Sequence, residues 1–204
     1  MSIGDLMSGT DLGPWFEVVT FAERKDSADS AIPAEGLLQQ GDFVPNLRVY
    51  YDPEAIQFPA TPEVELFALT VIVSQSCDLR PDDTHALVSP VYTVSELQQL
   101  GVRLNSDWDR IIRGLNPNYF ALAECPEPFA RATGAVDLTR TPEVSIRRLE
   151  AILEGLGQWL TLRTPHREDL AQHFARKFMR IGYPASHRPA SWKLLRDSLS
   201  PDAV

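Results

Sequence analysis

The sequence predicts an α+β fold in which a small antiparallel, β-barrel-like sheet is packed by C-terminal helices. The first two thirds of the chain hold runs of β-branched and aromatic residues bounded by turn residues, as strands do. The last third carries apolar residues at helical spacing. Since 44% of the 204 residues are hydrophobic, the chain can bury a sizeable core. We expect one domain, with an irregular N-terminal arm and the sheet in residues 1–140 and a helical part in residues 141–204.

Two strands separated by loops are predicted before residue 64. Residues 15–21 read as a strand, and residues 23–35, rich in Ser, Asp and Ala, read as a loop. A second strand is expected to begin after Gly41-Asp42, at residues 43–44, and to resume at residues 47–51. Three prolines then predict a loop over residues 52–63.

The strongest strand signal lies in residues 64–73. Its second half is rich in β-branched residues and is apolar on both faces, which is typical of a strand near the centre of a sheet. Residues 80–84 have turn chemistry, and residues 85–91 read as the returning strand. The two strands predict a β-hairpin.

The middle of the chain is predicted to alternate short helices and strands. Ser95 resembles a helix N-cap with Gln98 three residues later, and this helix would end at Gly101. A second short helix is expected over residues 106–113. Residues 119–123 and 135–138 are expected to be strands.

Two helices are predicted in the last third. In residues 146–160, apolar residues recur every three or four positions and form one face. A new helix should begin at Thr164-Pro165, where proline is tolerated in the first turn. Leu170, Phe174 and Phe178 would form its buried stripe.

The polar segment at residues 74–78 is the main candidate for chemistry. Loop residues at the end of a buried strand often bind or react, so Ser74, Gln75 and Ser76 are candidate binding residues. The candidate catalytic residues are Cys77, Asp78 and His85. In the hairpin His85 could face Cys77 and activate its thiol as a nucleophile. The alternative is a buried thiol, a polar turn that satisfies its own hydrogen bonds, and an exposed histidine.

Charge is distributed unevenly along the chain. The net charge of −9 argues against a general affinity for nucleic acid, but residues 160–204 hold eight basic against four acidic residues. We expect Arg167, Arg176, Lys177 and Arg180, on the last predicted helix, to contact RNA, DNA or an acidic protein partner. The alternative is a set of solvated helix faces that attract the acidic part of the chain.

Several classes of site are not predicted. The histidines at 166 and 173 are too far apart along a helix to share one ion, and no Cys-x-x-Cys motif occurs, so no metal site is expected. Phosphate-binding glycine motifs are missing too, and no cofactor is expected. Two cysteines, no signal-peptide pattern and no membrane-spanning run indicate a cytoplasmic protein.

The order and spacing of Gly41-Asp42, residues 71–74 and residues 86–91 resemble the MazF/PemK toxin barrel. The resemblance covers about residues 41–92. It implies a small SH3-like barrel that binds or cleaves RNA. In that family an arginine before the central strand, in an Arg-Pro pair, serves catalysis. Here Phe67-Ala68 stands at that place, and Arg80-Pro81 lies in the predicted hairpin loop.

A longer stretch, roughly residues 40–184, is similar to a group of bacterial proteins without an assigned activity. They share a strand followed by Gln-Ser-Cys-Asp, here residues 75–78, and a C-terminal helix like residues 166–180. We therefore expect an intracellular bacterial module that binds a protein or nucleic-acid partner, in a toxin or defence operon. The alternative is an enzyme, either a MazF-like ribonuclease or one that uses Cys77 as nucleophile.

Overall fold

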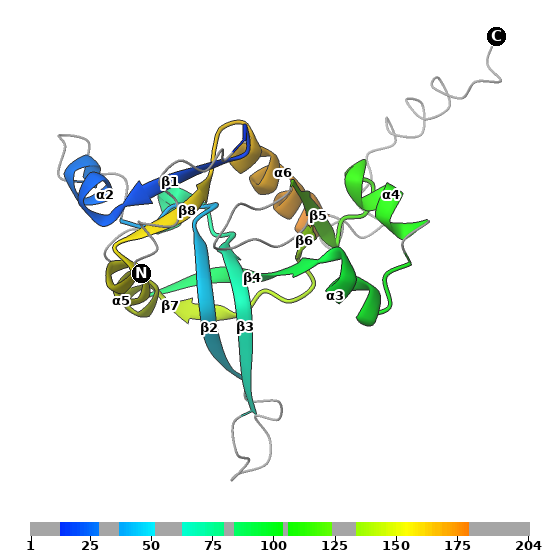
Figure 1. The fold of residues 1–204 in the computed structure, drawn as a ribbon, viewed down its shortest axis with the longest axis horizontal. Helices are drawn as coiled ribbons and strands as arrows, with labels where there is room; N and C mark the ends of the chain where they lie inside the picture. Colours follow the sequence, from blue (N-terminus) through cyan, green and yellow to red (C-terminus); the bar gives the residue numbers. More distant parts are fainter. Residues whose placement is uncertain are drawn as a thin grey trace, which may run out of the picture.

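The computed structural model describes residues 13–28, 37–51, 63–79, 84–103, 106–123 and 134–179. In these ranges the fold is mixed α/β with antiparallel sheets (Figure 1). The elements are β1 (Phe16–Thr20), α2 (Phe21–Ala28), β2 (Phe43–Tyr51), β3 (Glu63–Ile72), the 3-10 helix η1 (Ser76–Asp78), β4 (His85–Thr93), α3 (Val94–Gln99), α4 (Asp107–Ile112), β5 (Tyr119–Leu122), β6 (Gly134–Asp137), β7 (Glu143–Ser145), α5 (Ile146–Leu156), β8 (Gln158–Leu162) and α6 (His166–Met179). None of the described helices is long and apolar enough to span a membrane.

The strands form two antiparallel sheets. The larger has the order β2-β3-β4-β6-β5, and β7 pairs with the first half of β4. The smaller contains β1 and β8, and a bridge between Asp42 and Thr161 links it to the start of β2. The antiparallel pairing and the helices confirm the predicted α+β class. No closed barrel is found in the described ranges, so the barrel-like shape is not confirmed.

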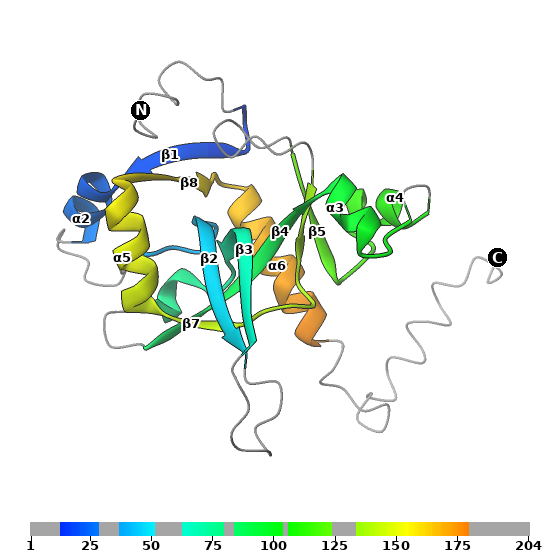
Figure 2. The ribbon, with the colours of Figure 1, turned by 60° about the horizontal axis from the view of Figure 1, so that its bottom comes forward.

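The predicted hairpin is confirmed. β3 pairs with β4 from Thr70 opposite Pro90 to Ile72 opposite Val88. β2 and β3 pair over a longer stretch, and the distal half of their ribbon projects from the body of the molecule (Figure 1). Figure 2 shows the two strands side by side from a second direction. The end of β3 is buried on both faces, because Val71 packs in one apolar cluster and its neighbour Ile72 in another.

The two C-terminal helices cover these clusters, as the sequence predicts. α6 packs on the cluster that holds Val71 through the fully buried Leu170. α5 packs on the cluster that holds Ile72 through Leu149 and Leu153. Phe178 departs from the expected buried stripe of α6, since it is 45% exposed.

The helix predicted over residues 146–160 is wrong at its end. α5 stops before Gly157, whose φ of +75° suits glycine and whose N–H bonds the carbonyls of Leu153 and Glu154. Residues 158–162 form β8, antiparallel to β1. Leu160 satisfies the helical spacing by coincidence, because Trp159, Leu160 and their neighbours are buried on both faces of a strand.

Two local predictions also fail. Residues 23–28 were expected in a loop but belong to α2, where the Glu23 carboxylate accepts hydrogen bonds from the Thr20 N–H and hydroxyl. The N-cap of α3 is Thr93 rather than Ser95, and Thr93 forms a complete capping box with Glu96. The predicted N-terminal arm before residue 13 and the loops over 29–36, 52–62 and 80–83 lie outside the described residues.

Candidate functional site

The serines of the segment after β3 serve the backbone. The Ser74 hydroxyl accepts a hydrogen bond from the Leu87 N–H at 2.7 Å, and the Ser76 hydroxyl accepts one from the Gln40 N–H at 3.1 Å. Gln75 and Asp78 are exposed at either end of η1. The position of Cys77 is within η1, but its side chain lies outside the described part of the structure. The segment therefore holds β4 and the strand entry at residue 40 in place.

His85 lies at the first position of β4. Its exposed ring is hydrogen-bonded through Nδ1 to the Thr84 hydroxyl at 2.9 Å, and its backbone pairs with Ser145 of β7. The described contacts of His85 are thus with its own neighbour and with β7. Catalysis by Cys77, Asp78 and His85 stays a prediction.

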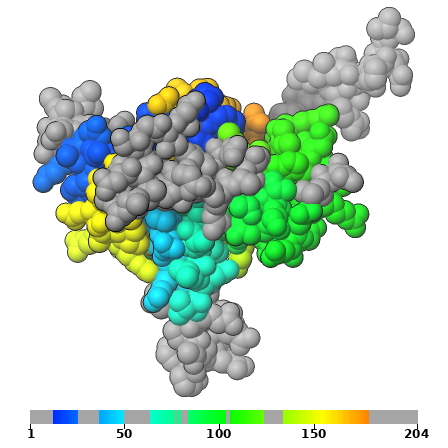
Figure 3. Space-filling view, viewed as in Figure 1, coloured from blue at the N-terminus to red at the C-terminus, as the bar shows by residue number. Residues whose placement is uncertain are grey.

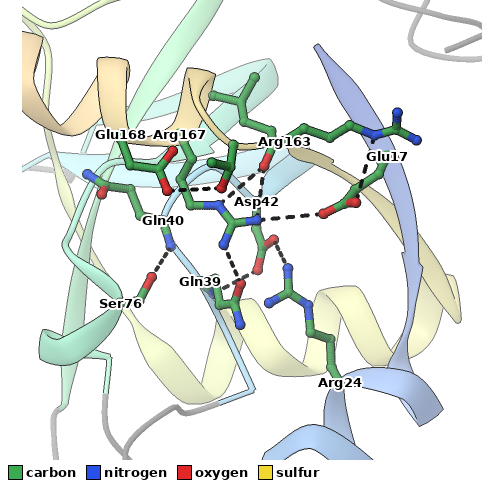
Figure 4. A network of polar contacts seen from close by, with 11 residues as sticks. Glu17, Arg24, Gln39, Gln40, Asp42, Ser76, Arg163, Arg167 and Glu168 are labelled. Atoms are coloured by element: carbon green, nitrogen blue, oxygen red, sulfur yellow. Dashed lines mark hydrogen bonds and ion pairs between the residues drawn. The ribbon is translucent and has the colours of Figure 1, made fainter. Parts of the chain in front are cut away.

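A polar network around residues 39–42 joins four parts of the fold (Figure 4). Asp42 is fully buried and accepts hydrogen bonds from the Arg24 guanidinium at 2.9 Å and from the Gln39 N–H at 2.8 Å. Burial raises the pKa of the Asp42 carboxyl, while the Arg24 charge and the hydrogen bond from the Gln39 N–H oppose that shift. The network fixes α2 against the entry to β2.

Gly41 is needed at the centre of this network. Its φ of +90° is a conformation that L side chains rarely adopt. Its N–H bonds the Ile72 carbonyl and its carbonyl accepts from the Leu162 N–H, so it connects the two sheets. A Cβ here would stand 3.1 Å from the Leu162 Cβ. The Gly41-Asp42 pair noted in the sequence is therefore a structural junction.

Arg167 has partners inside this network. Its guanidinium donates to the Leu162 carbonyl at 3.0 and 3.2 Å and to the Gln39 side-chain oxygen at 2.8 Å, and it lies 3.6 Å from the Glu17 carboxylate. Of the other predicted binding residues on α6, Arg176 is exposed and Lys177 is half-buried, whereas Arg180 lies outside the described residues. Burial lowers the pKa of Lys177, and the Asp137 charge opposes this.

Arg167→Ala is expected to lower the free energy of unfolding by about 1–2 kcal/mol, because charged hydrogen bonds to a carbonyl and an amide are lost. Arg176→Ala is the matched control on the same helix and should change it by less than about 0.5 kcal/mol. Urea unfolding of the two variants measures both values. Equal stability of the two variants would contradict the structural role of Arg167.

His173 of α6 is buried and donates from Nε2 to the Asn116 carbonyl at 3.0 Å. Burial lowers its pKa, and the Arg176 charge adds to the shift. The unfolded chain then binds a proton that the folded protein releases, so acidification through about pH 6.5 lowers stability. We expect the unfolding free energy to depend less on pH between 7 and 5 in His173→Gln than in the wild type, by chemical unfolding at each pH. An unchanged dependence would refute this assignment.

A second group of polar residues consists of Tyr92, Tyr119 and Asp137, on one face of β4, β5 and β6, and Arg140, which follows β6. We call these four residues the tyrosine site. Arg140 donates to the Tyr92 hydroxyl at 3.1 Å and to the Glu65 carboxylate at 2.6 Å. Both tyrosines are half-buried, and Asp137 is 3% exposed. The site therefore combines two half-buried phenols, a buried carboxylate and a half-buried guanidinium.

The electrostatics of the site raise the pKa of both phenols. Burial raises the pKa of Tyr92, and the charges of Glu65 and Asp137 add to the shift while Arg140 opposes it. Burial also raises the pKa of Tyr119, with Asp137 again adding to the shift. At neutral pH each hydroxyl can donate a hydrogen bond.

The tyrosine site borders the lobe formed by α3 and α4. Tyr92 and Tyr119 pack against Leu97 of α3 and Ile111 of α4. The same lobe carries exposed aliphatic side chains, and it stands out at one end of the molecule (Figure 3). The exposed aliphatic side chains of this lobe are Leu100 (52% exposed), Ile112 (58%) and Leu115 (57%).

Sequence reasoning missed the tyrosine site. Tyr92, Tyr119 and Asp137 come from three strands, and the register brings them together: Tyr119 is opposite Asp137, and Tyr92 is opposite Ala135. Arg140 follows β6 and joins them through its bond to Tyr92. The available signal was a polar or phenolic residue within each short apolar strand, where an apolar one would suffice.

Comparison of the chain with protein-family models, with curated proteins and with solved structures gave no match.

Proposed function

We propose that the protein is a cytoplasmic bacterial binding module for a protein partner, which it contacts through the tyrosine site and the α3–α4 lobe. One observation carries the proposal: Tyr92, which is bonded to Arg140, and Tyr119 are half-buried and pack against the α3–α4 lobe, and the same lobe carries three exposed aliphatic side chains. Tyrosine and arginine dominate the energetics of protein interfaces. Exposed Leu100, Ile112 and Leu115 on this lobe supply apolar area that association can bury.

Charge favours a protein over a nucleic acid. Arg167 is engaged within the fold, and the tyrosine site is surrounded by Glu65 and Asp107 as well as by Lys177. Binding to a phosphate backbone needs a surplus of positive charge, which this surface does not have. A partner with mixed charge fits it better.

We extend the proposal to the two sheets that support the binding surface and to the operon in which the protein acts. The two sheets, joined between Asp42 and Thr161, are proposed to act as one barrel-like support for the binding surface. The MazF/PemK-like motif order supports a role in a toxin or defence operon.

Photo-crosslinking in the source cells tests the contact directly. A photoreactive amino acid at position 112 in the exposed lobe should yield a covalent adduct with one protein, and the same amino acid at the exposed position 147 of α5 should not. Tyr119→Ala should reduce the adduct at position 112 by about tenfold. Adducts of equal yield at both positions, or with nucleic acid only, would overturn the proposal.

A further inference from the structure

We infer that the tyrosine site takes up a basic side chain, lysine or arginine, of the partner, and this inference rests on the proposed function. The register places Asp137 on the same sheet face as the two tyrosines. β6 lies between β4 and β5, Tyr119 is directly opposite Asp137, and Tyr92 is opposite Ala135, two residues away. Residues two apart on a strand share a face, so Tyr119 is the direct neighbour of Asp137 and Tyr92 is its diagonal neighbour on the other side. The Asp137 charge accordingly acts on both phenols.

Asp137 retains capacity for one more donor. Both hydrogen bonds that the described residues make to it, from the Thr139 N–H and hydroxyl, end on Oδ1. Oδ2 has no hydrogen bond among those residues, and it is not one of the enclosed polar atoms. A carboxylate that is 3% exposed gains most from a charged donor, because its own charge is poorly hydrated.

The protein's own cations do not fill this position. The Arg140 guanidinium is directed to Tyr92 and Glu65 and lies 5.6 Å above the Phe67 ring. The Lys177 ammonium senses the Asp137 charge but makes no ion pair with it within 4.0 Å in the described part of the chain. An incoming cation can therefore meet Oδ2.

The chemistry of Tyr92, Tyr119 and Asp137 favours a cation as the bound group. Phenol rings attract an ammonium or guanidinium through their negative faces, and the carboxylate adds charge attraction. An anion would be repelled by Asp137, and an apolar group would leave Oδ2 unpaired. Because Arg140 donates a hydrogen bond to the Tyr92 hydroxyl, the Tyr92 ring is held in place before the cation binds.

Titration of the full chain with n-butylammonium and with n-butylguanidinium tests the site without the partner. In protein with isotope-labelled tyrosine rings, we expect saturable shifts of the Tyr92 and Tyr119 signals with one or both cations, and the stronger binder identifies lysine or arginine. n-Butanol is the uncharged control and should cause no shift. Signals are assigned with Tyr92→Phe and Tyr119→Phe.

Asp137→Asn keeps an oxygen acceptor for Thr139 but removes the charge, and it should weaken cation binding by about tenfold. Asp109→Asn, on exposed α4, is the matched control and should have no effect. Three results would overturn the inference: equal binding by wild type and Asp137→Asn, no saturable shift, or a shift only in Lys177→Met, which would show that Lys177 occupies the site. If the adduct at position 112 forms while cations do not bind, the inference fails and the proposed function stands.

Discussion

Arg24→Ala is expected to lower the free energy of unfolding by about 3–5 kcal/mol, because it leaves a buried carboxylate without its cation. The Arg24 side chain is 7% exposed and the Asp42 side chain 0%, so water cannot replace the lost partner. Urea unfolding measures the loss. Lys25→Ala, at the exposed neighbouring position of α2, should stay within about 0.5 kcal/mol of the wild type.

The double variant Arg24→Met/Asp42→Asn sharpens this test. It removes both charges, so it should be more stable than Arg24→Ala. The deficit of Arg24→Ala should also depend on pH. Without Arg24, burial raises the folded-state pKa of Asp42 further above its unfolded value, so stability is lost as the pH rises through that pKa. A deficit below about 1 kcal/mol at neutral pH would contradict the importance of the pair.

Gly134→Ala is the second change with a large expected effect. A Cβ at position 134 would overlap the carbonyl oxygen of Tyr92, which belongs to the backbone of β4 and cannot turn away. Since Gly134 pairs with Thr93, the strands must separate there. We expect a loss of at least about 3 kcal/mol, the upper part of the range for overpacking, in thermal or urea unfolding.

Gly155→Ala provides a control with the opposite sign. Gly155 lies in α5, and a Cβ there would meet nothing within 4 Å. Alanine should therefore stabilise the protein by about 0.5–1 kcal/mol, because it reduces the backbone freedom of the unfolded chain. Similar stability of Gly134→Ala and Gly155→Ala would contradict the close approach of β4 and β6 at Gly134.

Local signals were sufficient for most strands of the larger sheet and for α6. β3 could be recognised because its β-branched run is apolar on both faces. The strand β8 could not, since Trp159 and Leu160 fit a continued helix as well, and only Gly157 in a left-handed conformation and the pairing with β1 decide between them. The helix α2 was missed although Thr20 and Glu23 form the T-x-x-E pattern of a helix start. Its contact with the distant Asp42 is one that local sequence does not reveal.

The roles of the predicted site residues also depend on contacts that are distant in the sequence. The hydroxyls of Ser74 and Ser76 stood out in the sequence, yet each accepts a bond from a distant backbone N–H. Arg167 resembled a surface cation and is bound to the end of β8 and to Gln39. These hydrogen bonds depend on which strand ends lie together in the fold. The sequence therefore identified the polar residues but not their hydrogen-bond partners.

The affinity of the purified partner for the tyrosine site tests the central claim most directly. With the crosslinked protein as ligand, the dissociation constant should rise by about tenfold or more in Tyr119→Ala and in Ile112→Glu. Arg147→Ala, on exposed α5, should leave it unchanged. Circular dichroism of each variant confirms that it is folded. Equal dissociation constants for the wild type, Tyr119→Ala and Ile112→Glu would contradict a protein interface at this surface.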